Sequence, residues 1–198
     1  METEENSEKL GIIFFSVIKA FTKFSIFPNE IFLLLNKGEN EETEKKSEYL
    51  DIIDYRSEIR EFLADASQYL GFQNLYQNFL FAEIQKLIEL IKIDKNNINA
   101  WANFEAYIFI ISSISKSITK EEKIDYINEL INTLIQIPDD LQKIKMTFID
   151  LIDNISSHLT INPEILIQIF RYLLINLENK GLIGTKNYNY FLYFLIFN

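Results

Sequence analysis

The chain has 198 residues, 48% of them hydrophobic, with 19 Lys and Arg against 29 Asp and Glu, which gives a net charge of −10. This apolar content supplies a sizeable core and argues against a chain disordered throughout. Because the sequence holds no cysteine, disulfides, thiolate zinc sites and thiol nucleophiles are excluded. The acidic balance argues against direct nucleic-acid binding, since phosphates would be repelled.

The first nine residues carry four glutamates, the reverse of the basic start of a secretory or mitochondrial targeting segment. The longest apolar stretches, 12–27 and 165–177, are interrupted by Lys19, Lys23 and Arg171. They fall short of the roughly 18 uncharged residues that a membrane span requires. We therefore expect an intracellular protein without a membrane span.

Helices are expected along the whole chain, because 5 Gly and 3 Pro leave few turn formers and apolar residues recur every three or four positions. A first helix is expected at about 8–25, ended by Pro28, and a shorter one at about 29–36, ended by Gly38. Gly71 divides a helix at about 47–70 from another at about 72–92.

The second half continues the pattern. A break at 94–97 precedes helices at about 98–118 and 120–136, the latter with a capping box of Thr119 and Glu122. Pro138, with two aspartates after it, opens a helix to about 159, and Pro163 opens one that ends before Gly181. The clearest apolar stripes are Trp101, Phe104, Tyr107, Ile108, Ile111, Ile114 and Ile118, and then Leu141, Ile144, Phe148, Leu151, Ile152, Ile155 and Leu159.

These helices group into hairpins at 1–37, 48–92, 97–136 and 139–180, with an acidic loop at 38–47 and a partial final helix at 185–198. The hairpins start roughly 40–50 residues apart, close to the range of HEAT repeats. The expected fold is all-α, an α-solenoid of about four to five HEAT-type, armadillo-like hairpins in one segment. From spacing alone, an irregular helical bundle remains the alternative. Apolar runs at 12–17 and 190–197 would leave exposed apolar surfaces, prone to self-association, at both ends of such a stack.

Particular residues along this pattern resemble a known family. In order they are Tyr55, Arg56, Gly71, Trp101, Glu105, Ala106, Phe109, Pro138 and Pro163. This series resembles the importin-β-like nuclear transport receptors, or karyopherins, and is most similar to the branch of transportin-SR and importin thirteen. The resemblance covers roughly residues 49–177 and rests on order and spacing rather than on one diagnostic motif.

The resemblance implies a receptor segment that binds protein cargo non-covalently, Arg/Ser-rich cargo included, and that works in cytoplasm and nucleus. Ran GTPase would then release the cargo. Family members have about twenty repeats, whereas we expect four or five here, without the amino-terminal repeats that carry much of the family's Ran contact. We therefore expect a piece or a diverged remnant of a receptor. After Gly184 the aromatic run 190–197 departs from the family pattern. The alternative is a helical-repeat scaffold or adaptor without a transport role.

Enzymatic chemistry is not expected. His158, the one imidazole, lacks a partner at metal-ligand or triad spacing and lies near the end of an expected helix, where a cation is favourable. Gly181 and Gly184 are wrongly spaced for a phosphate loop. Carboxylate pairs such as 150/153 have the i,i+3 spacing of any solvated helix face. The sequence therefore indicates no cofactor, no metal and no catalytic residue.

Three features have two interpretations each. Trp101 is either a partner-binding anchor or, as its stripe favours, a core residue. Glu105 either hydrogen-bonds a neighbouring helix end or faces solvent. Glu39, Glu41, Glu42 and Glu44 lie in the most polar stretch and form either a solvated linker or a contact for basic cargo.

Overall fold

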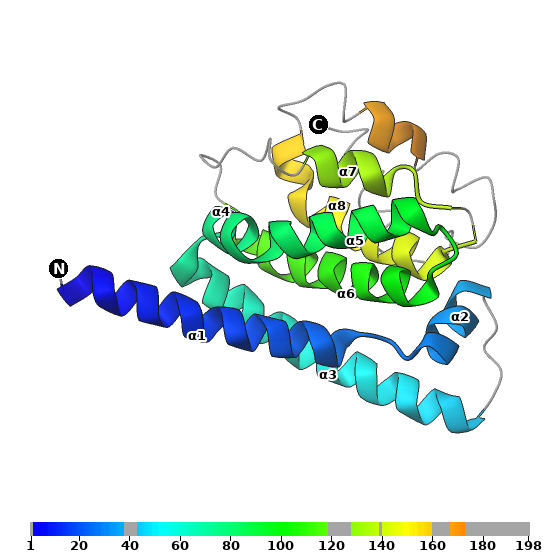
Figure 1. Ribbon diagram of the computed structural model, residues 1–198, viewed down its shortest axis with the longest axis horizontal. Coiled ribbons are helices and arrows are strands. Elements are labelled where there is room, and N and C mark those ends of the chain that lie inside the picture. The colour runs from blue at the N-terminus through cyan, green and yellow to red at the C-terminus, as the bar shows by residue number, and fades with distance from the viewer. Residues whose placement is uncertain (1, 38–42, 119–127, 139, 160–166, 173–198) are drawn as a thin grey trace.

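The computed structural model describes residues 2–37, 43–118, 128–138, 140–159 and 167–172. In these ranges the regular elements are all helical (Figure 1). They are α1 (Glu2–Ser25), α2 (Asn29–Lys37), α3 (Thr43–Leu70), α4 (Phe72–Leu75), a π-helical turn (Tyr76–Leu80), α5 (Phe81–Ile93), α6 (Ile98–Ile114), a 3-10 turn (Ser115–Ser117), α7 (Asn128–Leu134) and α8 (Gln142–Leu159). The all-α prediction is confirmed.

Helix α6 lies at the centre of the molecule. It packs most extensively against α8, then against α3 and α5, and it also contacts α1 and α2. From Ala100 to Ile114 its side chains are buried, apart from the half-buried Asn103 and Tyr107. A helix that is apolar around its whole circumference has no solvent face, so its neighbours must surround it.

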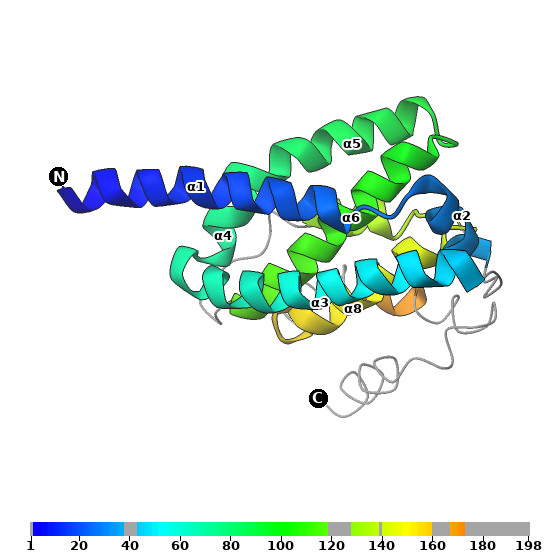
Figure 2. The same ribbon diagram turned by 90° about the horizontal axis from the view of Figure 1, so that it is seen from below.

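The two long helices α1 and α3 run antiparallel along one side of α6 (Figures 1 and 2). Aromatic side chains join them, with the ring of Phe62 on α3 5.8 Å from Phe14 and 5.3 Å from Phe21 on α1. The first turns of α1 project beyond the other helices in both views. Ile12 and Ile13 in this helix are 67% and 62% exposed.

The predicted apolar stripes form the core. In the stripe predicted at 141–159, the six apolar side chains up to Ile155 are all buried, while the Leu159 side chain lies outside the described residues. In the stripe predicted at 101–118, every apolar side chain is buried except that of Tyr107, which is half-buried. Trp101 is 4% exposed, and its indole donates a hydrogen bond to the Lys95 carbonyl at 2.8 Å. The core interpretation of Trp101 is confirmed.

Gly71 ends α3 as predicted. Its φ of +74° lies where residues with a Cβ are strained, and its amide donates to the Ser67 carbonyl at 2.9 Å. The helix predicted after it, 72–92, is interrupted by the π-helical turn Tyr76–Leu80. That turn adds a residue to the helical repeat, which period-counting along a sequence does not reveal.

Other predicted boundaries are wrong as well. Helix α1 begins at Glu2 rather than near residue 8, and α6 ends at Ile114 rather than near 118. Helix α3 begins at Thr43, so residues 43–47 of the predicted acidic loop, Glu44 among them, are helical. Glutamate and lysine are good helix formers, which explains the extension. Helix α8 begins at Gln142 rather than at Pro138. Its start is held from another helix, because the Lys143 amide donates to Asn36 Oδ1 of α2 at 2.8 Å.

This link between α2 and α8 bears on the solenoid prediction. In a strictly one-dimensional stack each repeat contacts only its neighbours. Here a helix of the first expected hairpin packs directly on a helix of the fourth, and both contact α6. Helices α1, α2, α3, α5 and α8 are therefore gathered around α6, and the division into HEAT repeats stays a prediction.

Several predicted features fall outside the described residues. They are Glu39, Glu41 and Glu42, the capping box at 119–122, the signal at Pro163, the glycines 181 and 184, and the run 185–198. Within the described part, no single helix is long and apolar enough to cross a membrane, although residues 12–25 and 29–36 meet that criterion together as a pair bent by 63°.

Truncation of Phe148 tests the stripe on α8. Phe148 is fully buried, with its ring 5.2 Å from that of Tyr172. Phe148→Ala should lower the free energy of unfolding by roughly 3–5 kcal/mol in urea titrations, because it leaves a cavity. Met146→Ala, two residues away and 40% exposed, is the control, for which we expect less than about 1 kcal/mol. Equal losses in both variants would contradict the assignment.

Candidate functional site

A buried ion pair joins α3 to α6. Arg56 and Glu105 are 5% and 0% exposed, and their side chains meet in two parallel hydrogen bonds. Arg56 Nη1 donates to Glu105 Oε1 at 2.9 Å, and Nη2 donates to Oε2 at 2.5 Å. This is the bidentate arrangement in which guanidinium and carboxylate match most closely.

The other side of the Arg56 guanidinium holds the end of α1. Both Nε, at 2.9 Å, and Nη2 donate to the carbonyl of Ser25, the last residue of that helix. Carbonyls in the last turn of a helix lack partners within the helix, so a cation there satisfies a group that burial would otherwise penalise. The rings of Phe27 and Phe109 lie 4.0 and 4.7 Å from the guanidinium carbon, close enough for cation–π contact.

Glu105 also reaches α8, because Thr147 Oγ1 donates to Glu105 Oε1 at 2.5 Å. Burial by itself would raise the pKa of the Glu105 carboxyl group. The charge of Arg56, its hydrogen bonds, the charge of Lys143 and the Thr147 hydrogen bond outweigh burial, so this pKa lies below its ordinary value of 4.5. The carboxylate therefore stays ionised inside the protein. The interpretation of Glu105 as a solvent-facing residue is wrong.

The structure thus brings together three residues of the family-like series, Arg56, Glu105 and Phe109. Ala106 is buried beside them in sequence, whereas Tyr55 is 52% exposed and lies against Phe24, with ring centroids 6.0 Å apart. Trp101, Gly71 and Pro138 support the fold elsewhere. The sequence suggested a helix end as the partner of Glu105. In the structure Glu105 is linked to the end of α1 only through Arg56, which also donates to the Ser25 carbonyl.

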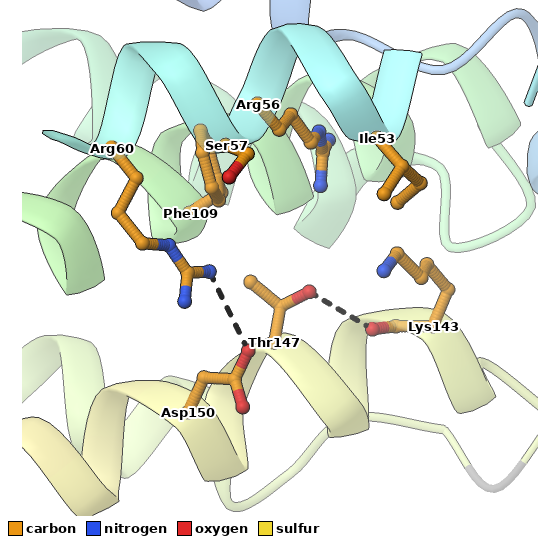
Figure 3. Close-up of a pocket in the computed structure, with 8 residues that line it drawn as sticks. All are labelled: Ile53, Arg56, Ser57, Arg60, Phe109, Lys143, Thr147 and Asp150. Atoms are coloured by element: carbon orange, nitrogen blue, oxygen red, sulfur yellow. Dashed lines mark hydrogen bonds and ion pairs between the residues drawn. The ribbon is translucent and has the colours of Figure 1, made fainter. Parts of the chain in front are cut away.

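A pocket of about 270 Å³ opens beside this pair, between α3 and α8 (Figure 3). Its lining residues are Ile53, Arg56, Ser57, Arg60, Phe109, Lys143, Thr147 and Asp150. Arg60 and Asp150 face each other across it at 3.7 Å, each with 35% of its side chain exposed. An ion pair so exposed and so long is weak.

Lys143 is the least compensated charge in this pocket. The residue is half-buried, and its side chain lines the pocket. Burial lowers the pKa of the Lys143 ammonium below 10.5, and repulsion by Arg56 and Arg60 adds to the effect, against the attraction of Glu105 and Asp150. Among the described residues its side chain has one specific contact, with the Phe27 ring at 5.1 Å.

Sequence reasoning missed Arg60, Lys143, Thr147 and Asp150. Asp150 was placed among the carboxylates of a solvated helix face, and the other three gave no motif. One signal was present, because Arg56 and Arg60 are four residues apart on α3 and Lys143, Thr147 and Asp150 repeat at four and three on α8. That spacing marks one face of each helix, but it does not show that the two faces meet.

Comparisons with known proteins leave the family open: the chain matches no family model, and no curated protein or solved structure matches it either. Within the described ranges there is also no group of three or more His, Asp or Glu side chains that could hold a metal ion.

Because Arg56 and Glu105 form a buried ion pair, we expect substitutions of the two residues to have strongly non-additive effects on the free energy of unfolding. Arg56→Met should lower the free energy of unfolding by about 3–5 kcal/mol, because it strands a buried carboxylate. The double variant Arg56→Met/Glu105→Leu should lose less than the sum of the two single losses, as measured by urea unfolding. Arg60→Met, one turn along the same helix, should cost less than about 1 kcal/mol. Additive losses would show that the two side chains do not interact.

Glu105 also predicts how stability depends on pH. The pKa of the Glu105 carboxyl group is lower in the folded chain than in the unfolded chain. Such a group contributes its full stabilisation of the folded protein at any pH above its unfolded-state pKa, near 4.5. This stabilisation is lost as the pH falls through the folded-state pKa. Glu105→Gln should therefore flatten the loss of unfolding free energy below about pH 4.5, whereas Glu83→Gln, on an exposed pair with Lys86, should not. Parallel pH curves for all three proteins would contradict this assignment.

Proposed function

We propose that this chain is a HEAT-repeat segment of an importin-β-like receptor and that it binds protein cargo non-covalently. The observation that carries the proposal is the buried cluster of Arg56, Glu105 and Thr147. These residues come from the second, third and fourth expected hairpins and are linked by hydrogen bonds of 2.5 to 2.9 Å. Two of them belong to the series that resembles the receptor family.

Such a cluster suits a stack of hairpins. A two-helix unit cannot bury both of its faces alone, so consecutive units need a contact that fixes how each lies on the next. A bidentate ion pair sets both distance and orientation, which an apolar contact does less strictly. On this proposal the pair keeps three hairpins in register, and cargo binds to the surfaces that they present.

The charge of the chain favours basic cargo. With a net charge of −10, it attracts cationic partners over distances up to the screening length, about 8 Å at physiological salt. An Arg/Ser-rich segment has that charge and little fixed structure. The segment from Glu39 to Glu44 concentrates carboxylates in a short stretch of the chain and is the proposed contact.

A second candidate is a helical scaffold or adaptor without a transport role. The direct packing of α2 on α8 favours it, because that contact closes the described helices around α6 rather than extending them in a row. The two candidates differ in whether Ran controls binding. Displacement of cargo by GTP-loaded but not by GDP-loaded Ran would identify a receptor segment. An adaptor should respond to neither form, and so should a receptor piece without the amino-terminal repeats that carry the family's main Ran contact, so only displacement is decisive.

Binding of an Arg/Ser-repeat peptide to the full chain tests the proposal. Fluorescence anisotropy should show binding that weakens as salt is raised, because the attraction is largely electrostatic. Replacing Glu39, Glu41, Glu42 and Glu44 by Gln should weaken binding and flatten its salt dependence.

The matched control replaces four exposed glutamates elsewhere, Glu30, Glu58, Glu61 and Glu89, by Gln and makes the same change in net charge. Equal weakening in both variants would mean that only total charge matters and would exclude the segment as a specific contact. No binding at low salt would refute the cargo proposal.

A further inference from the structure

The pocket between α3 and α8 has an excess of positive charge in an acidic protein. Three cations line it, Arg56, Arg60 and Lys143. Arg56 is neutralised by Glu105 behind the pocket wall, and Arg60 faces Asp150 at 3.7 Å. Lys143 forms no ion pair of its own among the described residues, so the three cations exceed the two carboxylates, Glu105 and Asp150, by one positive charge.

The side chains are arranged to receive a ligand. Figure 3 shows the Lys143 ammonium and the Arg60 guanidinium directed into the same space from opposite sides, with Ser57 and Arg56 across from Thr147. The volume of about 270 Å³ admits a side-chain-sized group. Burial of the Lys143 ammonium, which has no hydrogen-bonding partner among the described residues, disfavours its charged form, and an anion placed in the pocket would offset that cost.

We propose that this pocket binds one carboxylate group of a protein partner, held by Lys143 and Arg60 with Ser57 as a further donor. The inference rests on the proposed protein-binding function and adds a recognition point to it. A carboxylate fits because one unbalanced positive charge matches one negative charge, whereas a doubly charged phosphate would leave an excess negative charge among Glu105 and Asp150.

The surrounding charge gives this pocket a role in specificity. The chain as a whole repels acidic segments, so a lone carboxylate enters most readily as part of a neutral or basic segment. Such a segment would be attracted by the acidic surface and then fixed in register by one ionic contact inside the pocket. Complementary charge used in this way determines which partner binds, and how it lies, more than how tightly it binds.

The first experiment titrates the full chain with a capped peptide whose single charge is a glutamate, acetyl-Ala-Glu-Ala-amide, at constant ionic strength. Two-dimensional amide NMR should show saturable shifts confined to the pocket-lining stretches of α3 and α8. The neutral peptide acetyl-Ala-Gln-Ala-amide should bind at least tenfold more weakly. Acetyl-Ala-Ala-Ala with a free carboxyl terminus tests whether the source is a side chain or a chain end.

Variants assign the binding to Lys143. Lys143→Met should weaken the glutamate peptide about tenfold or more, because hydrogen bonds between charged groups are the strong ones. Lys143→Arg should retain binding. Lys92→Met makes the same change in net charge on the exposed face of α5 and should leave binding unchanged. Lys143→Met should fold at least as stably as the parent chain, which thermal melting checks, since it removes an uncompensated buried charge.

Equal binding of the glutamate and glutamine peptides, shifts away from the pocket, or an unchanged affinity of Lys143→Met would overturn the proposal. So would inorganic phosphate binding more tightly than either carboxylate at the same residues, because the pocket would then be a phosphate site. If these titrations fail while the Arg/Ser peptide still binds, only this inference is refuted. If they succeed while that peptide does not bind, the cargo proposal alone is refuted.

Discussion

The buried ion pair between Arg56 and Glu105 is the interaction on which the arrangement of the helices depends. Removing both charges from water costs several kcal/mol per ion, and such a cost is repaid only when nearly every donor and acceptor has a partner. That condition is met here, because Glu105 accepts from Arg56 and Thr147 while Arg56 also donates to the Ser25 carbonyl. The partners come from α1, α3, α6 and α8. We interpret the pair as a determinant of register, since it forms only when four helices are placed correctly.

The same rule governs the buried serines of α6. Ser113 donates to the carbonyl of Phe109 one turn back at 2.8 Å, which lets a hydroxyl remain inside a helix that has no solvent face. Asn154 of α8 donates to both oxygens of Ser112, its carbonyl and its hydroxyl, at 2.9 Å. The contact between α6 and α8, the most extensive in the molecule, therefore contains polar links at Thr147 and Asn154 within a mainly apolar surface. Those links restrict sliding between two helices that apolar side chains alone would position less strictly.

The sequence predicts the helices better than it predicts their arrangement. Helical periodicity identified the core side chains of α6 and α8 and the break at Gly71, because those depend on spacing within one segment. The central position of α6 was not predicted, although most of its residues are apolar on every side of the helix. The contact of Asn36 with Lys143 spans 107 positions, and no local pattern encodes it. Of the candidate site, Arg56, Glu105 and Phe109 were found through resemblance, whereas Arg60, Lys143 and Asp150 were not, since ordinary surface charges give the same spacing.

The pocket charges differ from those of the ion pair in one physical respect. Arg56 and Glu105 are compensated within the chain, so stability and register account for their burial. Lys143 is compensated less fully: burial lowers the pKa of its ammonium group in spite of the attraction of Glu105 and Asp150, and the group lines the pocket without an ion-pair contact among the described residues. An apolar residue of similar length could pack against Phe27 and spare the cost of desolvation. A residue that lowers the stability of the folded protein, among neighbours that raise it, is usually retained for function. The molecule thus holds two adjacent groups of charges, one that organises the helices and one that is available to a partner.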